Sequence, residues 1–163
     1  MASRLSKGGI LIDRQSRLSF SFNGKNFYGM KGDTLASALL ANDQTLLGRS
    51  FKYHRPRGLI ASGVEEPNAL LGIGSENKFE PNRSATTVQL FDGLMANSQN
   101  HFGPLNWDLG YFNNFISNFL PAGFYYKTFI QPRFAWKHVF EPFIRGAAGL
   151  GQAPKLPDDS SYD

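Results

Sequence analysis

The sequence feature that most constrains the fold is a β-hairpin signal at residues 17–28, RLSFSFNGKNFY. Leu18, Phe20 and Phe22 alternate with serines, which places the apolar side chains on one face of a strand. Asn23 and Gly24 then supply two residues that tolerate positive φ, as the type I′ turn of a two-residue hairpin requires. Such a hairpin has one apolar face, so another layer of the domain must cover it.

A helix is predicted directly after the hairpin and would provide that layer. Asp33 stands at the N-cap position of the run Thr34–Asn42, in which apolar residues recur at helical spacing. We expect Leu35 and Leu39 of this helix to face the apolar side of the hairpin.

Two further extended runs are predicted at Ala69–Ile73 and Thr86–Phe91. The order of two strands, a helix, a loop and two strands favours an α+β fold. We therefore predict a β-grasp domain at residues 17–92, preceded by an N-terminal arm at residues 1–16.

The amino-acid composition of the chain changes at about residue 93. Of the 23 aromatic residues, 14 fall between Phe102 and Phe143, where Gly and Pro recur. We predict an aromatic-rich extension at residues 93–145, mostly helical or irregular, with short helices near 112–119 and 134–143 and with part of its surface apolar. Residues 146–163 have the composition of a flexible linker.

Composition excludes several classes of site. The 163 residues include no cysteine, which removes disulfides, thiolate metal sites and cysteine nucleophiles. The three histidines are widely spaced and predict no metal site, and no glycine motif marks a dinucleotide site. No run of 18 apolar residues and no leader-like apolar segment occurs, so we expect a cytoplasmic protein with no membrane partner.

A basic loop is the main candidate for function. The run GRSFKYHRPRG at residues 48–58 lies in the electropositive half of the chain, where residues 1–83 carry 12 basic and 7 acidic groups. These side chains suit a cofactor phosphate, a nucleic-acid backbone or an acidic protein face, and the alternative is a solvated loop. The candidate contact residues are Arg49, Lys52, His54, Arg55 and Arg57. The adjacent acids Glu65 and Glu66 are expected to offer one salt-bridge partner to this loop rather than a catalytic acid.

Several long motifs resemble the N-terminal region of the alpha subunit of heterotetrameric sarcosine oxidase. The motifs are GDTLASAL at 32–39, GRSFKYHRPRG at 48–58, SGVEEPNAL at 62–70, LFDGL at 90–94, AGFYYKTF at 122–129, and EPFIR at 141–145 with AGLG at 148–151. They cover about residues 17–151.

The resemblance implies a ferredoxin-like β-grasp domain of the kind that carries a [2Fe–2S] cluster. The cluster-binding loop of that family would lie at residues 57–68, which here contain Ala61, Ser62 and Gly63 and no thiol. Because such clusters are held by thiolates, we expect this chain to bind no cluster and no other cofactor. The resemblance places NAD, FAD, FMN and tetrahydrofolate elsewhere in the complex.

The resemblance therefore suggests a non-catalytic structural or assembly module with no activity of its own and no catalytic residue. Its partners would be the remaining domains of the alpha subunit and the beta, gamma and delta subunits. The complex would demethylate sarcosine oxidatively to glycine, with tetrahydrofolate as one-carbon acceptor. The chain is expected to be a fragment of a longer subunit or the product of a split gene.

Two other functions stay open at this point. One is a small protein that binds nucleic acid or an acidic partner through residues 49–57, although a net charge of +4 offers few phosphate contacts. The other is a ferredoxin-type electron carrier, which the absence of cysteine argues against.

Overall fold

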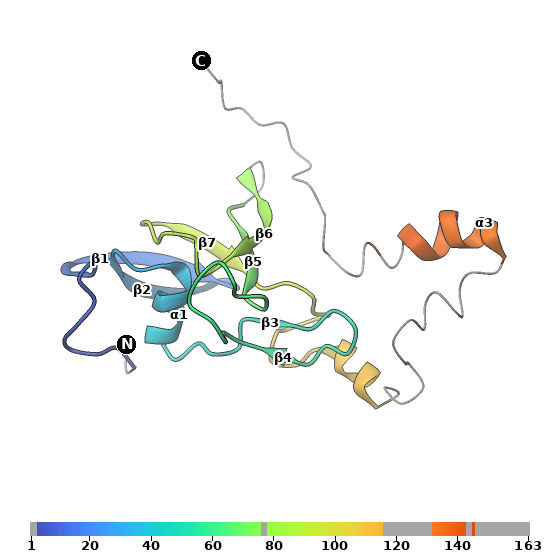
Figure 1. Cartoon of the computed structure of the whole chain (residues 1–163), viewed down its shortest axis with the longest axis horizontal. Coiled ribbons are helices and arrows are strands. Elements are labelled where there is room, and N and C mark those ends of the chain that lie inside the picture. Colours follow the sequence, from blue (N-terminus) through green and yellow to red (C-terminus); the bar gives the residue numbers. More distant parts are fainter. Residues whose placement is uncertain (1–2, 76–77, 116–131, 143–144, 146–163) are drawn as a thin grey trace, which may run out of the picture.

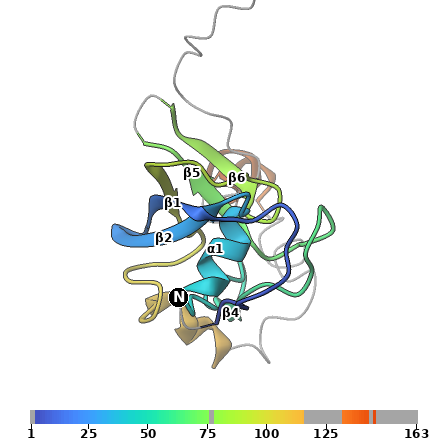
Figure 2. The ribbon, with the colours of Figure 1, turned by 90° about the vertical axis from the view of Figure 1, so that its left-hand side faces the viewer.

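The structure is a computed structural model that describes residues 3–75, 78–115, 132–142 and 145. A mixed five-stranded sheet in the order β2-β1-β7-β5-β6 is covered on one face by helix α1 (Figures 1 and 2). Strands β1 and β7 pair in parallel, and the other neighbours are antiparallel. The strands are β1 (Asp13–Phe22), β2 (Lys25–Lys31), β5 (Leu70–Ile73), β6 (Glu80–Ser84) and β7 (Leu94–Asn97), and α1 spans Leu35–Ala41. This is the α+β architecture that the sequence predicts.

The predicted hairpin is confirmed, including its turn. Phe20 pairs with Phe27 across β1 and β2, and the turn residues Asn23 and Gly24 have φ of 49° and 74°. β1 begins at Asp13, inside the segment that the sequence analysis assigned to an N-terminal arm. The register of β1 shifts between Asp13 and Arg17, so the first part of this strand lacks the regular alternation that marks residues 18–22.

Helix α1 begins one residue later than the sequence predicts, because its N-cap is Thr34 and not Asp33. Thr34 and Ser37 form a capping box in which each side chain bonds the backbone N–H of the other. Asp33 is buried instead. Its carboxylate accepts hydrogen bonds from the backbone of Met30 and pairs with Arg4 at 2.5 Å, which fixes the N-terminal arm against the start of the helix.

The hydrophobic core lies between α1 and the sheet, as the sequence predicts. Phe20, Phe22, Leu35 and Leu39 are all buried and belong to one cluster, and Leu18 packs against it partly buried. Gly29 of β2 faces the helix, where an added Cβ would lie 3.0 Å from Cβ of Ala38 in α1 and 2.3 Å from the end of the Leu90 side chain. The absence of a side chain at this position therefore helps the helix to lie close to the strand.

The second half of the sheet differs from the sequence prediction. Residues Leu70–Ile73 form β5 as expected, but Thr86–Phe91 forms no strand apart from one bridge between Gln89 and Thr34. The last two strands of the sheet are β6 and β7. β6 is a polar edge strand containing Pro81, which an edge tolerates, and β7 is a four-residue strand at the sheet centre, too short for its alternation to stand out.

Only parts of the predicted extension belong to the described residues. Leu109–Asn114 forms a 3-10 helix, η2, and α3 (Arg133–Ala135) continues into a π-helical turn, η4 (Trp136–Phe140). Residues 116–131 and the predicted linker at 146–163 lie outside the described residues. The division into arm, domain, extension and linker stays a prediction. Within the described residues, no helix has the length and apolar character needed to cross a membrane.

Candidate functional site

The basic loop is built by a short two-stranded sheet separate from the main one. β3 (Gly48–Arg49) pairs antiparallel with β4 (Pro56–Arg57), so the residues between them form a tight turn. In this turn the backbone N–H of His54 bonds the carbonyl of Ser50, and His54 has a φ of 52°. A non-glycine residue in this region needs its surroundings to hold it there.

Arg49 faces the interior of the chain. Its side chain is buried and donates to the carbonyl oxygen of Leu105 from Nε at 3.0 Å and from Nη2 at 2.8 Å. The same guanidinium also bonds the carbonyls of Asn106 and His54. Arg49 therefore joins the basic loop to a segment 56 residues further along the chain.

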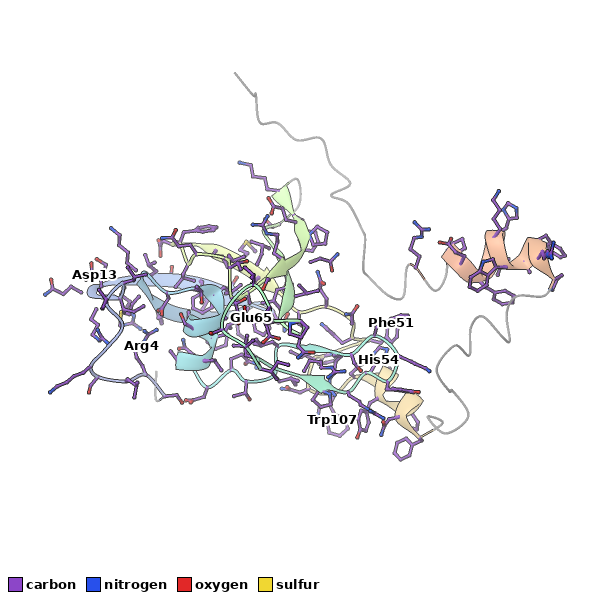
Figure 3. All side chains as sticks on the ribbon, in the orientation of Figure 1. Arg4, Asp13, Phe51, His54, Glu65 and Trp107 are labelled. Atoms are coloured by element: carbon purple, nitrogen blue, oxygen red, sulfur yellow. The ribbon has the colours of Figure 1, made fainter. Side chains whose placement is uncertain are left out.

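His54 is also buried, and it pairs with a carboxylate that the sequence analysis did not identify. The ring Nδ1 lies 2.6 Å from Oδ2 of Asp108, and the ring stacks on Phe102 with centroids 5.0 Å apart. An added Cβ at Gly110 would meet the His54 ring at 2.3 Å, so only glycine permits this approach. Figure 3 shows His54 and Trp107 on the side of the domain opposite Asp13.

Asp108 is the centre of this contact. Besides the bond to His54, its carboxylate accepts the backbone N–H groups of Phe102 at 2.8 Å and Gly110 at 2.9 Å, and it caps η2. Burial opposes the charged form of this carboxyl, but the two N–H donors and His54 outweigh burial and lower its pKa. The signal in the sequence was local, because Asp is among the residues preferred at a helix N-cap.

The other three basic residues stay near the surface. Arg57 and Arg55 are exposed, and Lys52 is half-buried. Lys52 and Arg55 both lie over the ring of Tyr53, at 4.9 and 4.8 Å from its centroid, and Arg55 also bonds Asn114 at 3.1 Å. The structure thus divides the five predicted residues into two groups. Arg49 and His54 hold the chain together, and a contact with a partner stays a prediction for Lys52, Arg55 and Arg57.

The acidic pair after this loop behaves differently from the prediction. Glu65 is exposed, whereas Glu66 is only 3% exposed and accepts backbone N–H groups instead of pairing with the basic loop. Oε2 bonds the N–H of Ile60 at 2.7 Å and of Ala61 at 2.6 Å, and Oε1 bonds that of Asn68 at 2.7 Å. The expected salt bridge is therefore wrong for Glu66, because the backbone N–H groups of its own loop take up both carboxylate oxygens.

The same N–H groups control the charge of Glu66. Burial opposes ionisation, but the N–H groups of Ala61, Asn68, Ile60 and Ala69 outweigh burial and lower the pKa of this carboxyl. In the described part of the chain Glu66 has no ion-pair partner within 4.0 Å.

The histidines occupy three separate settings. His54 pairs with Asp108, His101 bonds Ser98 and the carbonyl of Gly103, and His138 is exposed on η4. The residues that the structure describes contain no group of three or more His, Cys, Asp or Glu side chains placed to hold a metal ion.

Comparison with known proteins identifies the fold family. Residues 15–101 match the family described as "2Fe-2S iron-sulfur cluster binding domain". The chain is 52% identical over 160 residues to "Sarcosine oxidase subunit alpha" of Rhizobium meliloti strain 1021, covering 98% of this chain and 16% of that protein. It is 39% identical over 107 residues to the subunit of the same name from Corynebacterium sp. strain U-96, covering 64% of this chain and 11% of that protein. The chain thus spans about a sixth or less of the length of these relatives.

A solved structure, that of L-proline dehydrogenase from P. horikoshii, is similar at a TM-score of 0.41 and 24% identity, covering 53% of this chain and 16% of that one.

The donor set does not fit the cluster of the matched family. Plant-type clusters are held by cysteines spaced C-x₄-C-x₂-C, with a fourth further on. Ala61, Glu66 and Ala69 have that spacing in this chain, and the whole sequence contains no cysteine. Two alanines supply no ligand atom, and a single carboxylate already bonded to backbone N–H groups cannot replace a set of thiolates. In this chain the positions with cluster-ligand spacing hold no thiolate. The chain belongs to the family of 2Fe-2S iron–sulfur cluster binding domains and is a homologue of the sarcosine oxidase alpha subunit.

Proposed function

We propose that this chain is a non-catalytic structural and assembly module of a sarcosine-oxidase-like flavoenzyme. The observation that carries this proposal is the absence of cysteine from the chain, with the buried Glu66 and two alanines at the spacing of cluster ligands. A domain that keeps the fold of an electron carrier without any thiolate ligand has no iron–sulfur redox function. What remains for it is to support the rest of the enzyme.

The exposed aromatic side chains support the assembly part of the proposal. Around η2, Trp107 is 84% exposed and Phe115 73% exposed, and Leu109 and Phe112 are also exposed. Contiguous exposed apolar surface on a soluble domain is typical of a contact with another domain or subunit. The segment from 102 to 114 is held on the domain by Arg49 and His54, so it would present these side chains in a fixed orientation.

The remaining chemistry is what the resemblance of the sequence motifs implies, and it belongs to the same proposal. The full complex would demethylate sarcosine oxidatively to glycine with tetrahydrofolate as the one-carbon acceptor. NAD, FAD, FMN and tetrahydrofolate would bind in the other domains of the alpha subunit and in the beta, gamma and delta subunits. The proposal keeps the expectation that the protein is cytoplasmic.

The basic loop supports a contact with an acidic partner better than a contact with nucleic acid. Two of the five basic candidates are buried in contacts within the chain, whereas Lys52, Arg55 and Arg57 lie nearer the surface. So few phosphate contacts would give weak, strongly salt-dependent binding to nucleic acid. A short basic cluster is sufficient for an ion-pair contact at the rim of a protein interface.

The test uses the full enzyme complex with Trp107, Phe112 and Phe115 replaced together by serine. Loss of a docked aromatic cluster should lower subunit retention in size-exclusion chromatography by at least about tenfold, because such residues dominate interface energies. The matched control replaces Ile10 and Leu11, which are exposed apolar residues of the N-terminal arm. Equal retention of subunits and flavin in both variants would contradict the assembly role. Iron in the purified wild-type chain would contradict the cofactor-free role.

A further inference from the structure

The loop at residues 60–69 has the construction of an anion-binding site. The backbone N–H groups of Ile60, Ala61 and Asn68 point at one place, which the carboxylate of Glu66 occupies at 2.6 to 2.7 Å. The N–H of Ala69 also favours the charged form of this carboxylate and helps to lower its pKa. A concavity of successive backbone N–H groups attracts anions in proteins generally.

The loop depends on having an anion at this place. A buried N–H group without an acceptor costs free energy, and here several such groups would lose their acceptor together. The rest of the loop is fixed independently, since Thr86 bonds the carbonyl of Gly63 at 2.7 Å and Ala85 bonds that of Ala69 at 2.9 Å. These bonds come from the chain that follows β6. They would hold the loop at Gly63 and Ala69 after the carboxylate is removed.

The geometry also selects the kind of anion. One carboxylate oxygen accepts from Ile60 and Ala61 and the other from Asn68. The site therefore matches a planar anion with two oxygens rather than a spherical one. Replacing Glu66 with alanine removes a methylene carbon and its carboxylate, which are the same heavy atoms as those of acetate.

We propose that residues 60–69 form an anion-binding nest that Glu66 fills from within the chain, and that a variant without this carboxylate binds acetate there. In the wild-type chain the carboxylate of Glu66 is itself the anion that satisfies these N–H groups. This inference concerns the chain alone and holds whether or not the chain assembles with other subunits.

The experiment compares Glu66→Ala with Glu65→Ala in the full chain. Glu65 is the exposed neighbour, so its variant controls for the loss of one negative charge. In sodium chloride we expect Glu66→Ala to lower the Tm by about 5–10 °C and Glu65→Ala by less than about 2 °C. Replacing about 100 mM chloride with acetate should raise the Tm of Glu66→Ala by about 3–5 °C and leave the control and the wild type unchanged. Benzoate, whose ring exceeds the space released, should have no such effect.

Amide NMR spectra locate the bound acetate. Titration of Glu66→Ala with acetate should shift the N–H signals of Ile60, Ala61 and Asn68 and leave the wild type unaffected. If Glu66→Ala fails to fold in chloride, refolding in acetate but not in chloride supports the proposal, and failure in both overturns it. A Glu66→Ala variant as stable as Glu65→Ala overturns it, as does an acetate response without shifts at these amides.

Discussion

Residues 60–69 and residues 102–110 both fold around a buried carboxylate, Glu66 in the first segment and Asp108 in the second. Glu66 accepts from the backbone N–H groups of Ile60, Ala61 and Asn68, which lie within six residues of it along the chain. Asp108 accepts two backbone N–H groups from its own segment and a third bond from His54, which lies 54 residues away. The first carboxylate therefore organises one loop, whereas the second also joins two distant parts of the chain.

The largest expected effect concerns the core on which both segments rest. Replacing Phe20 with alanine removes a ring that is 3% exposed and that stacks on Phe27, so we expect a loss of about 3–5 kcal/mol in the free energy of unfolding. Denaturant titration measures it. A loss below about 1 kcal/mol would contradict the packing of the hairpin against α1.

Asp108→Asn tests whether this carboxylate, unlike that of Glu66, joins two distant parts of the chain. Because Asp108 is paired with His54 in a buried setting, we expect a loss of about 2–4 kcal/mol and release of residues 102–110 from the basic loop. Hydrogen exchange at the N–H groups of Phe102 and Gly110 measures the release, and Glu66→Ala should leave these groups protected. Asp92→Asn, which alters an exposed carboxylate bonded to Ser19, is the control. Unchanged protection in Asp108→Asn would mean that Arg49 alone holds the segment.

Acid should weaken both segments, and the variants show how much each contributes. The pKa values of Glu66 and Asp108 are lowered from ordinary values of 4.5 and 3.8 by their N–H donors, despite burial. A lowered pKa in the folded state contributes stability that is complete above the unfolded-state pKa and is lost as the pH falls through the folded-state pKa. We therefore expect the free energy of unfolding to decrease below about pH 4. Urea titrations of Glu66→Gln and Asp108→Asn should each show a shallower decrease than the wild type, and slopes equal to that of the wild type would contradict the assignment.

The smallest effect on folding belongs to the solvent-facing basic residues. Replacing Arg55 and Arg57 together with alanine should lower the stability of the chain by no more than about 1 kcal/mol, since both are exposed and the contacts of Arg55 with Tyr53 and Asn114 lie near the surface. In the full complex the same change should weaken subunit association about 2–10-fold if these residues contact an acidic partner. Lys25→Ala with Lys31→Ala removes equal charge from the exposed β2 edge and serves as the control. Unchanged subunit stoichiometry and flavin content in the arginine variant would leave the loop merely solvated.

The sequence predicted the hairpin and the helix because their signals are local. Alternating apolar residues, the Asn23-Gly24 turn and helical spacing each act within a few positions. The predicted N-cap is one residue early because Asp is a common N-cap residue. The carboxylate of Asp33 instead pairs with Arg4, and no local sequence pattern indicates this pairing. The sequence did not predict β7 because this strand has only four residues and pairs with β1, which lies more than 70 positions away.

The candidate site was predicted only in part, because some of its contacts join residues that are distant in the sequence. The basic loop was found by its composition, but the inward direction of Arg49 and His54 depends on Leu105 and Asp108, which are distant in the sequence. The sequence indicated an acidic pair at Glu65 and Glu66 and a salt bridge from one of them to the basic loop, rather than a cluster-ligand spacing that includes Glu66. The spacing of Ala61, Glu66 and Ala69 was the signal that would have identified it.

The parallel pairing of β1 with β7 also has a consequence for synthesis on the ribosome. Phe20 lies opposite Leu94, so one edge of the N-terminal hairpin stays without its partner strand until the chain has grown by more than 70 residues. At about 5–20 residues per second this interval is about 4–15 s, during which an apolar strand edge is exposed. Contacts between such distant residues also slow folding, because the intervening loop must close before they form. The nascent chain is thus most prone to aggregate, and most in need of chaperones, before residue 94 leaves the ribosome.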